Sequence, residues 1–526
     1  MRGFLHNLSC NPIELFPAHL RTIRVSFRTF AFLAWAATWL VSTPVRAELQ
    51  LASVLTDHAV LQRDVPIHVW GEDAPAEKIT ITFHGQSVTV TASSLGLWEA
   101  WLKPEAAGGP FTLVVHGSSD LTRSDLLVGD VWFASGQSNM EMPLAGFPPT
   151  AHVTNAEQEI AQADLPQVRL LRIEHQSSDS PLSGFSAAWQ PCTPATARDF
   201  SAVAYFFARE INRREHIPIG VIDSSWGGTP IDSWISLDAL SADPSLMPAF
   251  AARAHFADMQ THLDLIEAGE KKADAEAAAH HLPKPSHPWH PDPSSWIPAG
   301  LYNGMVAPFT PYAIKGFLWY QGETDSAADR ASLYAKLLPT LIADWRRQWG
   351  LGNLPFLFVQ ISSFESPGEN WGLIRDSQRQ TLHVVNTGMA VTLDIGQRDN
   401  VHPPDKQTVG ARLALAGRAV AYGEPGLEIS GPLYRQATRD GGALQIWFDH
   451  AEGLHSNGNE LKGFEIAGAD GRFVAATAKV QGTVVVVSSL EVAEPVEVRY
   501  AWQSFTDANL YNSVPLPAST FAAKVP

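Results

Sequence analysis

Short apolar segments alternate with longer amphipathic stretches from about residue 125 to residue 423, and this alternation limits the chain to few folds. The apolar segments cover residues 127–134, 168–173, 218–222, 314–320, 355–361 and 388–394, and the clearest helical patterns cover residues 201–214, 331–349 and 406–422. Continuous apolar runs are typical of strands that are buried on both faces of a parallel sheet. The sequence therefore predicts an α/β fold, with a three-layer domain in which helices cover both faces of a parallel sheet.

Segments of a different kind precede and follow this region. Alternating apolar and polar residues, separated by Gly and Pro, occur at residues 78–83, 87–91 and 111–116, and strand patterns return at residues 444–448, 473–480, 483–488 and 496–502. Alternation with a period of two indicates antiparallel strands with one buried face. The predicted organisation is an N-terminal β domain at residues 48–126, the α/β domain at residues 127–424 and a C-terminal β domain at residues 425–526.

The first 47 residues have the composition of a cleavable secretory signal. They contain five arginines and one acidic residue, then a mainly apolar run at residues 30–41, and they end in Val45-Arg46-Ala47. The apolar run is shorter than the ~20 residues that span a bilayer, which disfavours the alternative of an uncleaved membrane anchor. We expect residues 1–47 to be a signal peptide, and the mature protein to be periplasmic or extracellular, without a membrane association.

Charge and cysteine content exclude several kinds of partner. The net charge is −17 and no basic run is present, so the chain lacks the electrostatic footprint of a nucleic-acid-binding protein. Of the two cysteines, Cys10 lies in the predicted signal, so Cys192 has no partner for an intrachain disulfide after cleavage. The sequence gives no indication of the oligomeric state.

A serine follows the first apolar segment at a tight turn of small residues. In VWFASGQSNMEM, Ser138 stands where the chain leaves the predicted sheet, which would expose its hydroxyl as a nucleophile. A serine needs a base, and the base an orienting carboxylate. Asp399 and His402, three residues apart in one predicted loop, could supply both. Taken alone, His402 fits better into an ordinary loop that caps a helix, but its pairing with the serine turn favours the catalytic interpretation.

Two other segments could donate hydrogen bonds to an oxyanion. Trp226-Gly227-Gly228 follows a predicted strand and would allow a backbone N–H to approach a ligand closely, and Gln321 follows another strand. Either segment could instead be an ordinary tight turn. Glu323, two residues after Gln321, is an alternative to Asp399 as the carboxylate that orients His402, whereas Asp394 is expected to be structural.

Five long motifs occur in order and resemble those of one known family. They are VGDVWFASGQSNMEMPL, IGVIDSSWGGTPIDSWIS, LYNGMVAPFTPYAIKGFLWYQGETD, NTGMAVTLDIG and DNVHPPDKQTVGARLAL. They are similar to the motifs of the sialate O-acetylesterase-like carbohydrate esterases, a branch of the SGNH hydrolases. The resemblance covers nearly all of the chain after residue 47 and implies an SGNH-hydrolase-like α/β domain between two β domains.

The resemblance also implies roles for individual residues. Ser138 matches the nucleophile, His402 the base and Asp399 the acid, with an oxyanion hole from the N–H groups of Ser138 and Gly228 and the amide of Gln321. Lining or supporting positions match at Asn303 and Arg375, and Glu323 and Trp226, the latter as a surface for sugar stacking, are further candidates for substrate binding. Gln321 stands where many SGNH relatives carry an asparagine, and the chain lacks the extra β domain that some members insert within the catalytic domain.

Residues 240–300 are a helical and Pro/His-rich insertion. His280, His281, His287 and His290 invite comparison with a metal site, but the interleaved prolines do not give the short spacings of such sites. We expect a flap or cover beside the active site. No metal or organic cofactor is expected for the reaction that the resemblance implies.

The implied function is hydrolysis of acetyl esters on a carbohydrate substrate. Acetylated plant-wall glycans such as xylan or xyloglucan are slightly favoured over O-acetylated sialic acid. A non-catalytic carbohydrate-binding protein with the same fold is the main alternative, and a secreted serine peptidase does not explain the glycine and Gln-Gly-Glu segments. Met140 replaces the last glycine of a Gly-x-Ser-x-Gly elbow, which argues against a lipase-type enzyme.

Overall fold

A computed structural model of the chain describes residues 48–285, 287, 290–458 and 460–525, with the backbone alone for residues 251–261. The predicted signal peptide at residues 1–47 lies outside the described residues. Residues 48–526 form one compact unit. In the described part of the chain, no helix is both long and apolar enough to cross a membrane.

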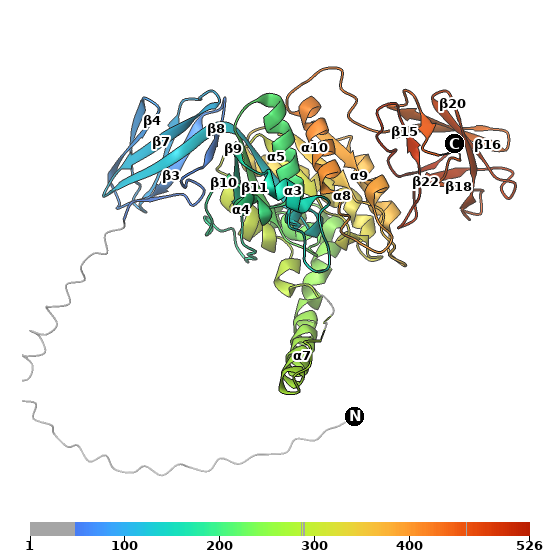
Figure 1. Ribbon diagram of the computed structural model, residues 1–526, viewed down its shortest axis with the longest axis horizontal. Helices are drawn as coiled ribbons and strands as arrows, with labels where there is room; N and C mark the ends of the chain where they lie inside the picture. Colours follow the sequence, from blue (N-terminus) through green and yellow to red (C-terminus); the bar gives the residue numbers. More distant parts are fainter. Residues whose placement is uncertain (1–47, 286, 288–289, 459, 526) are drawn as a thin grey trace, which may run out of the picture. The chain divides into compact units, whose positions relative to one another are not determined.

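The core of the structure is a large sheet in which parallel strands occupy the centre (Figure 1). Its strand order is β10-β9-β11-β8-β12-β13-β14, and all neighbours from β9 to β14 are parallel, whereas β10 pairs antiparallel with β9. The bounds are β8 Asp120–Gly136, β9 Leu165–Arg172, β10 Gln190–Cys192, β11 Ile219–Ser225, β12 Gly316–Tyr320, β13 Phe356–Gln360 and β14 Thr387–Val391. The predicted α/β class is confirmed.

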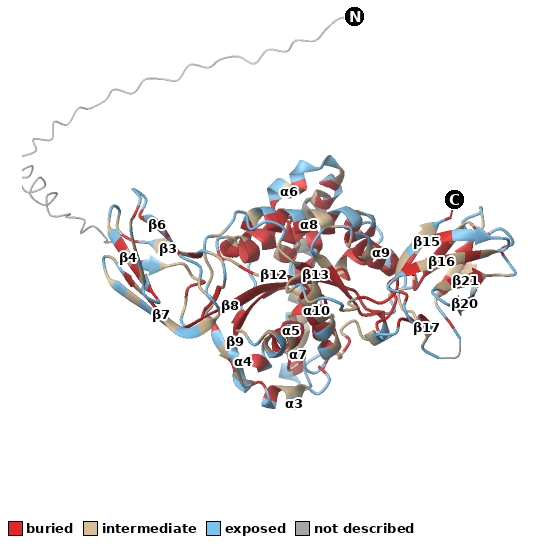
Figure 2. Ribbon diagram, turned by 90° about the horizontal axis from the view of Figure 1, so that it is seen from above, coloured by how far each residue is buried: buried red, intermediate tan, exposed pale blue. Residues whose placement is uncertain are grey.

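These strands form from continuous apolar runs because both faces of the sheet are covered. Every residue of β11, β12 and β13 is buried. Figure 2 shows helices α8 and α9 on one side of β12 and β13 and helices α5 and α10 on the other. The bounds are α5 Ala202–Glu215, α8 Tyr334–Trp349, α9 Trp371–Thr381 and α10 Lys406–Val420.

Local signals set the starts of the two helices that pack together. Ser201 caps α5 by accepting a hydrogen bond from the Ala204 N–H, and Asp405 caps α10 through the Thr408 N–H. A Cβ added to Gly410 would lie 2.5 Å from Phe206 Cβ, so the glycine permits a close approach of α10 to α5. This packing fixes the start of α10, which directly follows the His402 loop.

The order of the strands creates a position where a ligand crevice is expected. β8 comes first in the chain and lies at the centre, β9 and β11 follow on one side, and β12, β13 and β14 follow on the other. Such a reversal of strand order leaves a crevice outside the carboxyl ends of the strands. The segments that follow β8, β11 and β12 therefore meet at one place.

The first half of β8 belongs to the N-terminal sheets. Its earlier residues pair with β7 (Gly108–His116) and β2 (Val60–Gln62), so the boundary predicted near residue 126 falls inside a continuous strand. β4 (Lys78–Phe83) and β5 (Gln86–Thr91) extend this sheet through β7. A separate sheet contains β1 (Gln50–Leu51), β3 (Ile67–Glu72) and β6 (Leu97–Leu102).

The residues after α10 form antiparallel β structure, in agreement with the sequence pattern. One sheet has the order β15-β16-β21-β20, a second has the order β19-β18-β22-β24, and β17 pairs with β23. The bounds are β15 Leu433–Asp440, β16 Ala443–Asp449, β17 His455–Ser456, β18 Phe464–Ala467, β19 Val474–Ala475, β20 Thr477–Gln481, β21 Val484–Ser488, β22 Glu497–Tyr500, β23 Leu510–Tyr511 and β24 Phe521–Lys524.

The segment at residues 240–300 is mainly helical. His287 Nε2 lies 2.8 Å from Asp274 Oδ1, and His290 Nε2 lies 3.6 Å from Glu270 Oε2. Within the described residues, no three His, Cys, Asp or Glu side chains are grouped so that they could hold a metal ion. The helices are α6 Leu237–Ala242, η3 Pro244–Phe250, α7 Ala251–Ala279 and η4 Pro293–Trp296.

Shorter helices complete the connections between the strands. They are α2 Ser138–Glu141, α3 Ala156–Ala161, α4 Pro194–Arg198, η2 Ile231–Trp234, η5 Tyr302–Val306, η6 Ala307–Phe309, η7 Thr324–Ser326, η8 Ala331–Leu333 and η9 Leu393–Ile395. The first of them carries the serine that the sequence analysis singled out.

Candidate active site

Ser138 begins α2 directly beyond the carboxyl end of β8, at the reversal of strand order. Gly136 makes this turn possible, because its φ is +138° and an added Cβ would lie 2.1 Å from the Tyr320 carbonyl oxygen. The Gln137 N–H then donates to the same Tyr320 carbonyl at 3.0 Å. The turn is thereby fixed to the end of β12, and Ser138 is left partly exposed.

The structure brings His402 to Ser138, as the sequence analysis expected. The Nε2 of His402 lies 2.8 Å from the Ser138 Oγ across 264 positions of sequence. Burial, reinforced by the positive charge of Lys406, lowers the pKa of His402 to about 4, while Glu141 acts in the opposite direction. The imidazole is therefore neutral at pH 7 and able to accept the serine proton.

Asp399 does not make the contact that a Ser-His-Asp triad requires. It is exposed on the loop, and among the described residues no hydrogen bond or ion pair joins it to His402. The loop is instead shaped by Asn400, whose Oδ1 accepts the His402 N–H at 2.9 Å. The ring of Phe147 packs edge-on against the imidazole, with centroids 5.5 Å apart. Glu323, the alternative carboxylate, does not contact His402 either.

The glycine turn after β11 lies against the nucleophile. The Trp226 N–H donates to the Gly136 carbonyl at 3.0 Å, and the Gly227 N–H donates to Glu141 Oε2 at 2.6 Å. A Cβ added to Gly227 would lie 3.2 Å from the Ser138 Cβ. In the described part of the chain, neither the N–H of Gly228 nor that of Ser138 donates a hydrogen bond. These two N–H groups are therefore free to bind an oxyanion.

Gln321 is placed behind the glycine turn. Its side chain is fully buried, and its Nε2 donates to the Thr229 carbonyl at 3.1 Å and to Asp325 Oδ2 at 2.5 Å. Because an amide nitrogen has two hydrogens, both are already committed. The geometry therefore assigns Gln321 to holding the turn that contains Gly228, rather than to direct donation as the family resemblance implied.

The end of the 240–300 segment also reaches this turn. The indole N–H of Trp296 donates to the Gly228 carbonyl at 2.9 Å, and the Ala299 N–H donates to the Asp232 carbonyl at 3.0 Å. The carboxyl end of the predicted insertion is therefore attached to the turn that contains Gly228.

A buried polar network lies beside Ser138 and was missed by the sequence analysis. The Nδ2 of Asn139 donates to Glu323 Oε1 at 2.6 Å and to the Val401 carbonyl at 3.0 Å, while Lys406 Nζ donates to Asn139 Oδ1 at 2.5 Å. Burial raises the pKa of Glu323 and lowers that of Lys406 to about 7. A lysine at the first position of a helix is usually exposed, so nothing in the sequence indicated that Lys406 is buried.

A second missed group forms one wall beside the nucleophile. His175 stacks on Trp226, with ring centroids 4.4 Å apart and an interplanar angle of 4°, and its Nε2 lies 2.9 Å from Glu141 Oε1. His175 is exposed and Trp226 is half-buried. Burial raises the pKa of Asp223 to about 7, against the hydrogen bond from Ser225. Trp226 thus directly precedes the glycine that lies against Ser138, and His175 stacks on its ring.

Two other predicted pocket residues hold loops in the structure. Asn303 Nδ2 donates to the Ser178 carbonyl at 3.0 Å. Arg375, on α9, is fully buried, and its guanidinium donates to the carbonyls of Ala501, Gln503 and Ser504. Burial lowers the pKa of Arg375 to about 9. The structure does not bring either side chain into contact with Ser138 or His402.

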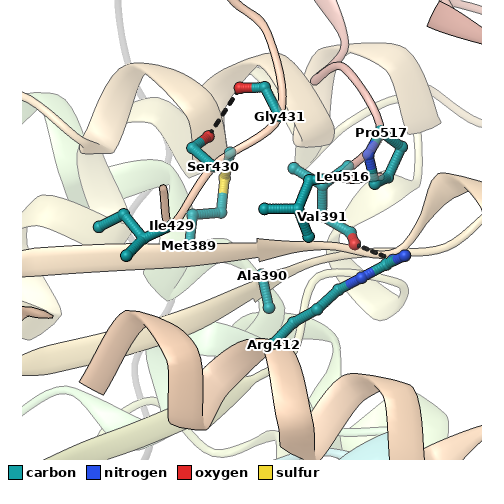
Figure 3. Close-up of a pocket in the computed structure, with 9 residues that line it drawn as sticks. All are labelled: Met389, Ala390, Val391, Arg412, Ile429, Ser430, Gly431, Leu516 and Pro517. Atoms are coloured by element: carbon teal, nitrogen blue, oxygen red, sulfur yellow. Dashed lines mark hydrogen bonds between the residues drawn. The ribbon is translucent and has the colours of Figure 1, made fainter. Parts of the chain in front are cut away.

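A small cavity elsewhere is formed by β14, α10 and residues near the C-terminus (Figure 3). Arg412 crosses it and donates to the Val391 carbonyl at 2.7 Å, and the same guanidinium pairs in bidentate fashion with Asp394. The expected structural role of Asp394 agrees with this ion pair. None of the predicted site residues lines the cavity.

Comparison with known proteins relates this site to one family. The family model described as carbohydrate esterase, sialic acid-specific acetylesterase, matches residues 288–418. The sialate O-acetylesterase of Mus musculus is 30% identical over 543 residues, which cover 92% of this chain and 96% of the mouse protein. The enzyme of Rattus norvegicus is 30% identical over 533 residues, covering 90% of this chain and 94% of the rat protein.

A solved structure gives the same relationship. The crystal structure of a carbohydrate acetylesterase from Xanthomonas citri is 37% identical, with a TM-score of 0.78, and the match covers 91% of this chain and 100% of that one. The family predicted from the sequence motifs is confirmed. The chain therefore belongs to the sialate O-acetylesterase family of carbohydrate esterases and is a carboxylic-ester hydrolase.

Proposed function

We propose that this protein removes acetyl esters from carbohydrates by an SGNH-type mechanism in which Ser138 is the nucleophile and His402 the base. The observation that carries the proposal is the 2.8 Å hydrogen bond between Ser138 Oγ and a neutral His402, beside two unoccupied backbone N–H groups. The location outside the carboxyl ends of β8, β11 and β12 supports it.

The reaction begins when Ser138 Oγ attacks the acetyl carbonyl carbon and His402 Nε2 takes the hydroxyl proton. The N–H groups of Ser138 and Gly228 stabilise the oxyanion of the tetrahedral intermediate. His402 then gives its proton to the departing sugar oxygen, which leaves an acetyl-serine. A water molecule, deprotonated by His402, attacks this ester, and acetate is released as Ser138 recovers its proton.

The substrate that we propose is an acetylated plant-wall glycan fragment, of the xylan or xyloglucan type, with O-acetylated sialic acid as the second candidate. The half-buried Trp226, which precedes the Gly227 turn against Ser138 and stacks on the exposed His175, supports an aromatic surface for a sugar ring near the acetyl group. We also propose that residues 1–47 direct export, since acetylated polysaccharides of this kind lie outside the cell. N-terminal sequencing of the exported protein tests this, and a start at Glu48 is the expected result.

The first experiment compares the protein with its Ser138→Ala variant. The substrates are 4-nitrophenyl acetate, acetylated xylo-oligosaccharides, acetylated xyloglucan oligosaccharides and O-acetylated sialic acid, and the measurement is acetate release. Loss of a triad member costs about 10⁴-fold or more in kcat, so we expect Ser138→Ala to be inactive on every substrate.

Ser94→Ala is the matched control, because Ser94 is exposed in an N-terminal loop. It should retain full activity. Equal turnover by Ser138→Ala and the unmodified protein would contradict the nucleophile assignment. A preference for sialic acid over both plant-wall substrates would overturn the proposed substrate class while leaving the mechanism intact.

A further inference from the structure

Asn139 joins the segment that carries the nucleophile to the segment that carries the base. Asn139 directly follows Ser138, and Val401 directly precedes His402. The Asn139 Nδ2 donates to the Val401 carbonyl at 3.0 Å, close to the 2.8 Å contact between Ser138 and His402. One amide side chain therefore fixes the distance between two loops that are separated by more than 260 residues.

The basic group of Lys406 and the acidic group of Glu323 determine the orientation of this amide. Lys406 Nζ donates to the Asn139 Oδ1, and Glu323 Oε1 accepts from the Asn139 Nδ2. A flipped amide would face its NH₂ toward the ammonium group and its oxygen toward the carboxylate, so both contacts would be lost. Asn139 and Lys406 are fully buried and Glu323 is 7% exposed, so these charge-assisted hydrogen bonds are shielded from water.

Within the described residues, no side chain other than that of Ser138 is hydrogen-bonded to the imidazole of His402. Asp399 is exposed and makes no contact with His402, and the Asn400 contact is confined to the same loop. In a Ser-His-Asp site a carboxylate bonded to the imidazole orients the base. In this structure, the position of the His402 loop relative to Ser138 depends instead on the hydrogen bond from Asn139 to the backbone of that loop.

We propose that Asn139, held between Lys406 and Glu323, is the positioning residue that keeps Ser138 and His402 in reacting geometry. This inference rests on the proposed roles of Ser138 and His402. The Lys406-Asn139-Glu323 bridge acts through the two loops and does not touch the substrate.

The bridge also affects the protonation of His402. Lys406 disfavours a second positive charge on the imidazole, whereas Glu141 favours it, and burial has the largest effect. Lys406 itself faces Glu323 and Asp405, which stabilise its charge, and the ring of Tyr320 at 5.7 Å. Removal of the Lys406 charge should therefore raise the pKa of His402. Because the base must be unprotonated, activity would then be lost sooner as the pH falls, at a higher pH than in the unmodified protein.

The test uses the whole protein with 4-nitrophenyl acetate as the probe. We expect Asn139→Leu, which has a similar volume but no hydrogen bonds, to lower kcat by about 10²-fold, since a misplacement of about 1 Å has this effect. KM should change little, because the substrate is not contacted. If this variant does not fold, Asn139→Asp keeps the acceptor for Lys406 but loses the donor to Val401, and the same fall in kcat is expected.

The pH dependence of kcat/KM separates positioning from a merely structural role. Lys406→Met should move the acid limb of the profile to higher pH by about one unit, a shift typical of the loss of a close charge. Lys406→Arg, which keeps the charge, should restore the limb. The exposed Lys479→Met is the matched control and should match the unmodified protein.

Two results would overturn the proposal. One is a kcat within threefold of the unmodified value in folded Asn139→Leu or Asn139→Asp, and the other is an acid limb that does not move upward in folded Lys406→Met. Ser138→Ala, measured in the same assays, distinguishes a failure of the proposed function from a failure of the proposed bridge. Activity in Ser138→Ala would refute the proposed function, whereas an inactive Ser138→Ala with fully active Asn139 variants would refute the bridge alone.

Discussion

Asp399 and His402 lie in one loop, yet only His402 faces the nucleophile. Three residues of loop allow an aspartate to reach an imidazole, but they do not require it, because each side chain's direction depends on local backbone angles. The Asn400 side chain accepts a hydrogen bond from the backbone N–H of His402, and Asp399 is exposed to solvent. In the described structure, the imidazole of His402 is therefore bonded to Ser138 but not to a carboxylate.

Asp399→Asn should lower kcat/KM by less than about tenfold, in contrast to the ~10⁴-fold loss in kcat seen when a bonded triad carboxylate is replaced. The exposed Asp470→Asn, in the C-terminal β structure, is the control. Steady-state hydrolysis of 4-nitrophenyl acetate measures the effect. A fall of 10³-fold or more would show that Asp399 engages His402 during turnover.

The turn between β11 and η2 shows how one short element is held from several sides. Glu141 accepts the Gly227 N–H, Gln321 donates to the Thr229 carbonyl and Trp296 donates to the Gly228 carbonyl. These contacts come from α2, from the segment after β12 and from η4. These contacts hold the turn in place, so that in the proposed mechanism the Gly228 N–H would not have to reorient when the oxyanion forms.

Gly227→Ala should disturb this element without unfolding the protein. The new Cβ would lie 3.2 Å from the Ser138 Cβ and 3.1 Å from Glu141 Oε2, so the turn or α2 must shift by a few tenths of an ångström. We expect kcat to fall by about tenfold, since oxyanion stabilisation depends on donor distance. Gly269→Ala, at a helical site in α7 with open space around it, should leave kcat unchanged. Equal kcat values for both variants would contradict the assigned position of the turn.

Helix α9 connects the central sheet to the C-terminal strands. Arg375 on α9 donates to three carbonyls at residues 501–504, just after β22, and Gln360 at the end of β13 donates to Ser519 Oγ at 2.7 Å. The contacts with Ala501 and Ser519 are buried, and those with Gln503 and Ser504 are partly buried. The C-terminal β structure is therefore attached to the layer that carries the segments around the site.

Arg375→Met should weaken the folded state rather than the chemistry. It removes the donors to buried carbonyls, and each unsatisfied buried group costs about 1–3 kcal/mol, so we expect the free energy of unfolding to fall by about 2–5 kcal/mol. Urea unfolding measures this, and the exposed Arg213→Met is the control. The kcat of the folded Arg375→Met protein should stay within about twofold of the unmodified value. A large loss of kcat with unchanged stability would instead support the pocket role suggested by family resemblance.

The sequence by itself determined the class of fold, and it predicted the pair of side chains, Ser138 and His402, that meet in the structure. Apolar runs predicted β9, β11, β12, β13 and β14 to within a few residues, because burial on both faces leaves a strong local pattern. Ser138 and His402 were found for a related reason. Each follows a strand, and strands of a parallel sheet deliver their carboxyl ends to one edge.

Only the tertiary structure decided which polar side chains face the pair. Gln321 turned out to hold a neighbouring turn, Asp399 to lie in solvent, and Lys406 to be buried beside Asn139. A sequence shows the residue type and its place along the chain, but not the direction of its side chain. That direction depends on strand order and on contacts across hundreds of residues, which arise only when the sheet is assembled.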